Sequence, residues 1–282
     1  HHASVRFISR PQANHRCFVA PERNSGRVKI ATWNVNSMNV RQPHVIEWLQ
    51  AHEPDVLMLQ EIKQITEKFP VDDLQALGYH SIASGQKTYN GVAVMSKLPA
   101  TDPITDFPDF EDAQRRILAV TIGDIRVINL YIPNGSEVGS EKYAYKLDWL
   151  AALHRFLAAE IRQHEKLVVL GDFNIAPTDA DVHDPEKWGE AILCSPAERK
   201  ALARLIELGL TDVFRKFEHP EKTFSWWDYR AAGFRRNAGL RIDLILTTDA
   251  MTDRCTACYV DKEPRGWERP SDHAPVVAEF GF

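Results

Sequence analysis

The chain contains little cysteine and no long apolar run. Its 282 residues include four cysteines, too few for a disulfide scaffold, and no apolar run approaches the roughly 20 residues of a membrane helix. No segment shows the charged, apolar and small-residue order of a signal peptide. These absences argue against a disulfide-rich secreted domain and a membrane protein, and we expect a cytoplasmic location with no membrane partner.

Two of the cysteines, Cys255 and Cys258, have the spacing of half a zinc site. No second pair of cysteine or histidine residues follows at a suitable distance. Cys258 falls in an expected strand and Cys255 directly borders it, and in an extended chain positions i and i+3 face opposite sides. We therefore interpret them as structural.

An overall excess of positive charge is also absent, since the net charge is -5. The charge is unevenly distributed, however. Residues 1–28 carry five arginines and one glutamate, and residues 214–241 carry seven basic against three acidic side chains, so each stretch has a local charge of +4. Because local charge matters more than the total for attracting a polyanion, a nucleic-acid partner remains possible.

No internal repeat, low-complexity segment or linker divides the chain. His1 and His2 have the form of a purification-tag remnant, and residues 1–27 lack periodicity. We expect residues 1–27 to be a flexible tail and residues 28–282 to form one domain.

Short apolar strands alternate with amphipathic helices along residues 28–282. We expect strands at 28–34, 55–60, 79–83, 91–96, 117–122, 125–130, 166–170, 241–247, 256–260 and 275–280, and helices at 43–52, 71–77, 141–164 and 196–208. Strand hairpins mixed with crossover helices favour an α/β fold in which two mixed β-sheets pack face to face with helices outside.

Polar residues stand where several of these strands begin or end. Residues 171–174, Gly-Asp-Phe-Asn, follow one strand, and residues 271–273, Ser-Asp-His, precede another, while Asn34 and Glu61 end two more. Strand ends hold side chains rigidly at an exposed edge, where they serve chemistry better than packing. This set of carboxylates, amides and one imidazole suits a hard divalent cation and a phosphate.

Magnesium prefers oxygen ligands in near-octahedral geometry. We predict Glu61 as its first ligand, with Asn34 and Asp272 completing or supporting the shell. Asp172 and Asn174 are further candidates beside the same ion. A single glutamate at a strand end is more often a solvated surface group, so this prediction depends on the whole set.

Hydrolysis of a phosphodiester also needs an oriented water and donors aimed at the phosphate. Asp172 is placed to position the water, with Asn174 beside it, although Gly-Asp-x-Asn alone is equally typical of a turn. His273 is the expected phosphate donor, and Asp243 would orient its imidazole. Tyr131 and Asn134 add a phenol and an amide, although an isolated histidine or tyrosine more often packs in the core.

Several blocks of sequence match a known family in order and separation. They are residues 33–36, 59–61, 85–87, 91–93, 114–116, 131–135, 171–177, 224–230, 239–243 and 270–275. Over about residues 28–282 the chain resembles the exonuclease III family of abasic-site endonucleases and 3′-repair nucleases, within the endonuclease/exonuclease/phosphatase superfamily. Each block is weak alone, but together they are highly specific.

This resemblance implies one catalytic domain with a four-layered α/β sandwich. It implies Mg²⁺ or Mn²⁺ as cofactor, double-stranded DNA with abasic sites or damaged 3′ ends as partner, and a monomer acting at the nucleoid in base excision repair. The metal environment would then comprise Asn34, Glu61 and Asp272, and Asp172 would position the water. Four residues would surround the phosphate with Asp243 behind His273: Tyr131, Asn134, Asn174 and His273.

The resemblance also implies a DNA-contacting loop over residues 224–241. Trp226 and Leu240 would be the apolar walls of a pocket for an abasic sugar, which flips out of the duplex readily. Backbone or pocket contacts are expected from Arg115, Arg116, Arg235 and Asn237.

The chain departs from the family pattern in two places. Residues 36–38, Asn-Ser-Met, replace an acidic residue or glycine followed by glycine and a large apolar residue, which would loosen the surroundings of the metal ligands. Residues 183–194 lie where members differ most. We expect this stretch to narrow the pocket and to favour trimming of 3′ ends over cleavage at abasic sites.

Two other functions are consistent with part of this pattern. The same catalytic core could act on a small phosphate ester, as in an inositol-phosphate phosphatase or a sphingomyelinase-like enzyme, but these lack blocks like residues 226–228 and 239–241. A non-catalytic DNA- or protein-binding module is disfavoured because every expected catalytic position is filled.

Overall fold

The computed structural model describes residues 26–282, which fold into two six-stranded β-sheets flanked by helices. One sheet has the order β13-β14-β1-β2-β4-β3 and consists of β1 (Arg27–Asn34), β2 (Val56–Gln60), β3 (His80–Ser84), β4 (Val92–Ser96), β13 (Cys255–Val260) and β14 (Val276–Gly281). The other has the order β5-β6-β7-β8-β12-β9 and consists of β5 (Thr101–Ile104), β6 (Ile117–Ile122), β7 (Ile125–Tyr131), β8 (Leu167–Asp172), β9 (Leu210–Asp212) and β12 (Asp243–Thr248).

A short hairpin and the helices complete the described chain. The hairpin pairs β10 (Trp226–Trp227) with β11 (Gly239–Leu240). The helices are α1 (Met38–His52), α2 (Val71–Ala76), α3 (Glu141–Gln163), α4 (Pro185–Trp188), α5 (Pro196–Ile206) and α6 (Asp249–Thr252). No helix formed by residues 26–282 is both long and apolar enough to cross a bilayer.

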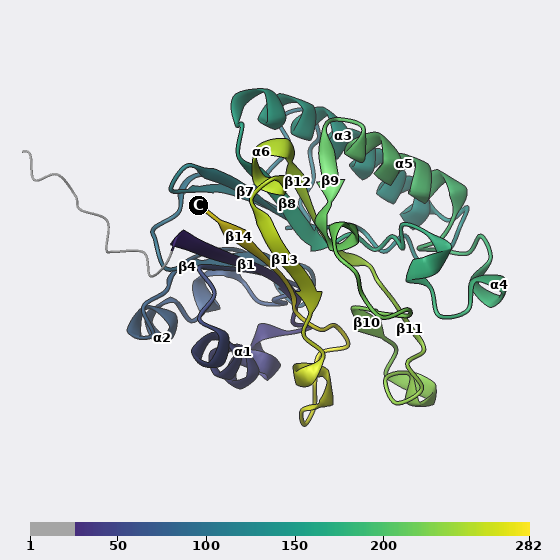
Figure 1. Cartoon of the computed structure of the whole chain (residues 1–282), viewed down its shortest axis with the longest axis horizontal. Helices are drawn as coiled ribbons and strands as arrows, with labels where there is room; N and C mark the ends of the chain where they lie inside the picture. Colours follow the sequence, from purple (N-terminus) through teal and green to yellow (C-terminus); the bar gives the residue numbers. More distant parts are fainter. Residues whose placement is uncertain (1–25) are drawn as a thin grey trace, which may run out of the picture.

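The strands are apolar on both faces because each sheet lies between two other layers. In β8, Val168 and Leu170 enter the core between the sheets, whereas Leu167 and Val169 pack on the outer face with residues of α3 and α5. The first sheet buries its outer face in the same way under α1 and α2. Figure 1 shows the resulting four layers, with α1 and α2 on one side and α3 and α5 on the other. The expected α/β sandwich is confirmed.

The structure corrects several expected boundaries. The expected tail, residues 1–27, lies outside the described residues except for Gly26 and Arg27, and Arg27 already belongs to β1. Helix α1 begins five residues before the expected start, at Met38, because the Ser37 side chain accepts a hydrogen bond from the Val40 backbone N–H and caps it. The short strands β5 and β9, the β10–β11 hairpin and the short helices α4 and α6 were not expected.

Strand β8 extends to Asp172, so this aspartate lies in the strand and not after it. Asp172 is paired with a residue on each neighbouring strand, Tyr131 of parallel β7 and Asp243 of antiparallel β12. The preceding Gly171 has φ 142°, and a Cβ atom there would lie 1.9 Å from the Leu130 carbonyl oxygen. Glycine is therefore required for β7 and β8 to remain this close at their ends.

The first and last described strands are neighbours. β1 pairs antiparallel with β14, with Arg27 opposite Gly281. Beyond this pair, the Phe282 backbone N–H donates a 2.8 Å hydrogen bond to the Gly26 carbonyl. The two ends of the described chain thus meet at one edge of the molecule.

Candidate active site

Three ionisable side chains from distant parts of the sequence converge at one rim of the sandwich. Glu61 follows β2, Asp172 ends β8 and His273 precedes β14. Each residue offers one atom that could bind a metal ion, and these three atoms all lie within 4.8 Å of one another. The sequence prediction that these strand ends meet is therefore correct.

Asp172 is almost completely buried and receives donors on both oxygens. Its Oδ1 accepts a 3.0 Å bond from the Asn174 backbone N–H, and its Oδ2 accepts a 2.9 Å bond from Asn34 Nδ2. Burial, together with the carboxylates of Asp243 and Glu61, raises the pKa of Asp172 to about 7, although nearby His273 opposes this shift. A carboxylate with a raised pKa can take up a proton near neutral pH.

His273 lies between two carboxylates. Its Nδ1 is 2.8 Å from Asp243 Oδ2, and its Nε2 is 3.5 Å from Asp172 Oδ2. Burial alone would lower the pKa of His273, but the charges of Asp243 and Asp172 outweigh it and hold the pKa well above 6.5. The ring is therefore a charged donor, and Asp243 stands behind it as the sequence predicted.

Asn34 supports the carboxylates instead of presenting an oxygen to an ion. Its Nδ2 donates to Glu61 Oε2 at 2.6 Å and to Asp172 Oδ2 at 2.9 Å, while its Oδ1 accepts from the Asn36 backbone N–H at 3.0 Å. Of the two roles considered for Asn34, the geometry fits the supporting one. Asn36 Oδ1 accepts a 2.6 Å hydrogen bond from Lys63 Nζ, and this ammonium lies 3.9 Å from Glu61 Oε1.

The second group of predicted residues lies beside Asp172. Asn174 has φ 49° and donates from Nδ2 to the Ile132 carbonyl at 2.8 Å. Its Oδ1 lies 3.5 Å from Asn134 Nδ2. Burial and the carboxylates of Glu61 and Asp172 raise the pKa of Tyr131 well above 10, so its phenol keeps the proton and can donate it in a hydrogen bond.

Asp272 is set apart from the three converging groups. Its Oδ2 accepts a 3.1 Å bond from Trp226 Nε1, and its Oδ1 is buried with no hydrogen-bond partner among the described residues. A buried carboxylate oxygen without a donor is costly. Glu61 and Asp172 offer the carboxylate oxygens that a hard divalent cation prefers, and the unpartnered Asp272 Oδ1 is a further acceptor outside the group of Glu61, Asp172 and His273.

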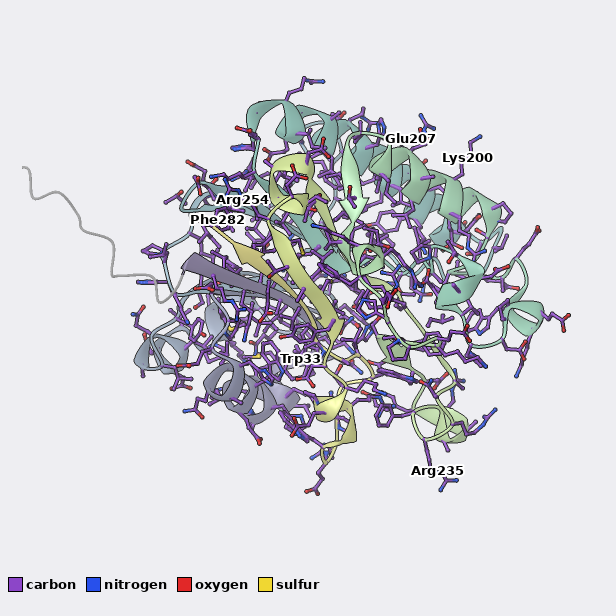
Figure 2. The ribbon with its side chains drawn as sticks, viewed as in Figure 1. Trp33, Lys200, Glu207, Arg235, Arg254 and Phe282 are labelled. Carbon is purple, nitrogen blue, oxygen red and sulfur yellow. The ribbon has the colours of Figure 1, made fainter. Side chains whose placement is uncertain are left out.

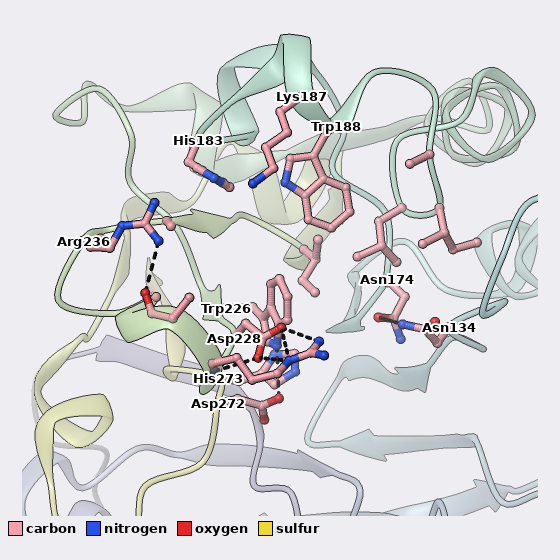
Figure 3. Close-up of a pocket in the computed structure, with 18 of the residues that line it drawn as sticks. Asn134, Asn174, His183, Lys187, Trp188, Trp226, Asp228, Arg236, Asp272 and His273 are labelled. Atoms are coloured by element: carbon pink, nitrogen blue, oxygen red, sulfur yellow. Dashed lines mark hydrogen bonds and ion pairs between the residues drawn. The ribbon is translucent and has the colours of Figure 1, made fainter.

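A pocket of about 620 Å³ opens beside these groups. Figure 3 shows His273, Asp272 and Trp226 close together, with His183, Lys187 and Trp188 across the pocket. Leu240 is fully buried and is paired with Trp226 in the β10–β11 hairpin. It therefore packs behind the pocket wall that Trp226 forms and does not line the pocket itself. The stretch that was expected to narrow the pocket does line it, through His183, Lys187, Trp188, Ala191, Ile192 and Leu193.

The four residues expected to contact DNA do not line this pocket. Arg116 is buried, lies 4.8 Å from the centre of the Tyr131 ring and donates to the Tyr131 carbonyl. Arg115 pairs with Asp106 at 2.9 Å.

The other two expected contacts lie in the loop between β10 and β11. Asn237 accepts a 2.9 Å bond from Trp227 Nε1, so it fixes the loop from within. Arg235 is exposed and points away from the molecule (Figure 2). Sequence reasoning missed Arg230 and Arg236, which line the pocket, although both lie in the basic stretch 214–241.

Comparison with known proteins identifies the family. Residues 31–273 match the endonuclease/exonuclease/phosphatase family. The chain belongs to this family. It is 38% identical over 267 residues to exodeoxyribonuclease III of Haemophilus influenzae, which covers 90% of this chain and 100% of the relative.

Similarity to solved structures agrees with this family assignment. The 3′ phosphatase NExo from Neisseria, solved with a product DNA hairpin, has a TM-score of 0.89 and 50% identity, with 90% of this chain and 100% of that chain covered. An AP endonuclease from Archaeoglobus fulgidus has a TM-score of 0.86 and 41% identity over 90% of this chain and 99% of its own. The resemblance to the exonuclease III class drawn from the sequence is confirmed.

Proposed function

We propose that the chain is a Mg²⁺- or Mn²⁺-dependent DNA-repair nuclease that acts on double-stranded DNA at abasic sites or damaged 3′ ends. The observation that carries the proposal is the convergence of Glu61, Asp172 and His273 beside a pocket walled by Trp226. The exodeoxyribonuclease, 3′ phosphatase and AP endonuclease named among the relatives support it.

The residues of the chain suit hydrolysis of the bond between phosphorus and O3′. Asp172, with its raised pKa, would orient the attacking water and take its proton. The imidazolium of His273 would donate to a non-bridging oxygen, where negative charge accumulates, and Asp243 would keep it charged. A divalent cation, when held by Glu61 with Asp172 and Asp272, would neutralise charge on the phosphate and on the leaving O3′ oxygen, which would take its proton from solvent water.

Tyr131, Asn134 and Asn174 would complete the phosphate surroundings. The Tyr131 phenol keeps its proton because of its raised pKa, so it is a donor to an anionic oxygen. Asn134 and Asn174 lie in two adjacent turns, so their amides can approach the phosphate from the side opposite Trp226 (Figure 3). These roles belong to the proposal and are tested with it.

Within this activity, we propose that processing of 3′ ends exceeds incision at abasic sites. The segment that lines the pocket opposite Trp226 is attached to the β10–β11 hairpin: Val182 forms a β-bridge with Leu240, and His183 N–H donates to the Gly239 carbonyl at 3.1 Å. A wall attached in this way leaves less freedom for a flipped sugar to enter. The 50% identity to a 3′ phosphatase supports the same ranking.

Two alternative functions make different predictions. A small phosphate ester would need no DNA-facing hairpin, whereas here Trp226 is docked to the site through Asp272 and His273. A non-catalytic module would not need the paired Asp172 and His273. Hydrolysis of a small ester without hydrolysis of DNA would support the first alternative, and DNA binding without hydrolysis the second.

The test uses a panel of end-labelled duplexes with Mg²⁺ or with a chelator. One duplex carries an internal abasic analogue, and others carry a recessed 3′-OH or a 3′-phosphate. We expect metal-dependent turnover of the 3′-end substrates to exceed abasic-site incision, and Asp172→Asn to lose every activity. Faster incision of the abasic duplex would contradict the ranking, and metal-independent turnover would contradict the mechanism.

A further inference from the structure

A completely buried ion pair lies behind the catalytic rim. Lys146 of α3 and Glu198 of α5 are each 0% exposed, and the Lys146 ammonium donates directly to the Glu198 carboxylate. Taking two charges out of water is costly, and an apolar pair of similar volume is often as stable. Neither residue faces the pocket, and the reaction proposed above does not use them.

The remaining hydrogen bonds of Lys146 lead to the active site. Its Nζ donates to the Asn134 carbonyl at 3.2 Å and to the Asn174 carbonyl at 2.6 Å. The Asn134 Nδ2 and Asn174 Oδ1 atoms of these two residues lie 3.5 Å apart, and the proposed function places both side chains beside the phosphate. One ammonium thus joins the turn after β7 to the turn after β8.

The turn after β7 packs directly on the stem of this lysine. A Cβ atom on Gly135 would lie 3.0 Å from Lys146 Cδ and 2.9 Å from Ile192 Cδ1. Because Gly135 has φ 86° and little space for a side chain, a residue with a Cβ atom here would push the turn away from the lysine stem.

Glu198 extends the network to the pocket wall. Its Oε1 accepts from the Leu193 backbone N–H at 2.9 Å and from Ser195 Oγ at 2.8 Å. Ser195 Oγ in turn lies 2.8 Å from the Tyr143 hydroxyl of α3. The pair therefore connects the wall residue Leu193 with both asparagine turns.

We propose that the Lys146–Glu198 pair is a positioning element, which fixes Asn134 and Asn174 relative to Asp172 through their backbone carbonyls. The inference rests on the proposed nuclease function and deepens it. Asn174 also supplies the backbone N–H that holds Asp172 Oδ1, so a shift of this turn changes both the amide and the carboxylate.

The test compares variants of this pair with a matched buried pair. Lys146→Met removes the ammonium, and Glu198→Gln keeps a hydrogen-bonding side chain if the first variant folds poorly. The control is Arg126→Met, because Arg126 and Glu160 form a buried ion pair at 3.0 Å between β7 and α3. Arg126 lies near the start of β7, whereas the site lies at its end.

Measured per folded molecule on a 3′-phosphate duplex with saturating Mg²⁺, we expect Lys146→Met and Glu198→Gln to slow single-turnover hydrolysis by about 10- to 100-fold, since small misplacements have effects of this size. DNA affinity should be unchanged. Arg126→Met should lower the melting temperature while keeping the wild-type rate. Wild-type rates in both pair variants, whatever their melting temperatures, would overturn the inference.

A double-mutant cycle separates positioning from general damage. If Lys146 acts through Asn174, then Lys146→Met should have a much smaller effect on the rate in an Asn174→Ala background. Full multiplication of the two effects would refute this route. An inactive wild-type protein on every duplex would contradict the proposed function instead, so the two failures are distinguishable.

Discussion

At the scale of single residues, the site depends on which groups keep their charge. Burial lowers the pKa of His273, yet Asp243 and Asp172 together raise it well above 6.5. The imidazolium therefore persists through neutral pH and is lost as pH rises through the raised pKa. Any contribution of this charge to the free energy of unfolding is likewise fully present below pH 6.5 and is lost as the pH rises through the raised pKa.

Replacing Asp243 tests this electrostatic arrangement. Asp243→Asn removes the charge that contributes most to raising the pKa of His273, so we expect the alkaline fall in hydrolysis to move to lower pH. The maximal rate should also drop by about 10²–10³-fold, the size of effect seen when one donor to a developing charge is lost. The measurement is the pH profile of single-turnover hydrolysis, and an unmoved alkaline limb would argue against the assignment.

The sequence predicted the members of the site better than their contacts. Glu61, Asp172 and His273 were recognisable because each stands beside the end or the start of an apolar run that reads as a strand. Arg116 and Asn237 were expected on DNA, and the structure adds their partners within the protein: Arg116 lies over the Tyr131 ring, and Asn237 accepts a hydrogen bond from Trp227. Such partners depend on neighbours that only the folded chain brings together.

At the scale of elements, the end of β8 sets the position of Asp172. Gly171→Ala would force a Cβ atom against the Leu130 carbonyl, so we expect a loss of about 2–5 kcal/mol in the free energy of unfolding. The matched control is Gly209→Ala, which has φ 109° and no atom within 4 Å of the added Cβ. It should lose about 1–2 kcal/mol.

Denaturant unfolding of both glycine variants provides the measurement. Equal losses would mean that backbone strain, and not the close approach of β7 and β8, is the dominant effect.

The β10–β11 hairpin places Trp226 over the pocket. Trp226→Ala should weaken discrimination between damaged and intact duplexes, because the apolar wall is removed and Asp272 loses its 3.1 Å donor. Trp226→Phe keeps the wall without the donor and should retain most of the selectivity. Competition between the two duplexes measures the effect, with Trp267→Ala, outside the pocket, as control. Unchanged selectivity in Trp226→Ala would refute the pocket assignment.

Long elements were more predictable than short ones. Helix α3 has the apolar periodicity of a helix packed on one side, and the central strands are continuous apolar runs because both faces of each sheet are covered. The two-residue strands β10 and β11 have none, and their pairing comes from tertiary contacts. The Lys146–Glu198 pair was invisible for a related reason, since its members are 52 residues apart and look like ordinary surface charges of two helices.

At the scale of the whole molecule, the two sheets bring several carboxylates to one rim. A bound cation should relieve their repulsion, so we expect Mg²⁺ or Mn²⁺ to raise the melting temperature and a chelator to abolish hydrolysis without unfolding the protein. Thermal melts with and without metal measure this. Glu61→Gln should lose most of the metal-dependent rise, and an equal rise in that variant would place the ion elsewhere.

The meeting of Gly26 and Phe282 has a consequence for how the fold tolerates rearrangement. Because β1 and β14 are already paired where the described chain starts and stops, a short covalent join between them would disturb no strand pairing. New termini could then be opened at the Gly123-Asp124 turn, at the end of β7 remote from Tyr131. In such a circular permutant the elements would follow one another in a different order along the chain, yet the same rim would form. The positions of the catalytic groups depend on how the strands pack and not on the order in which they are synthesised.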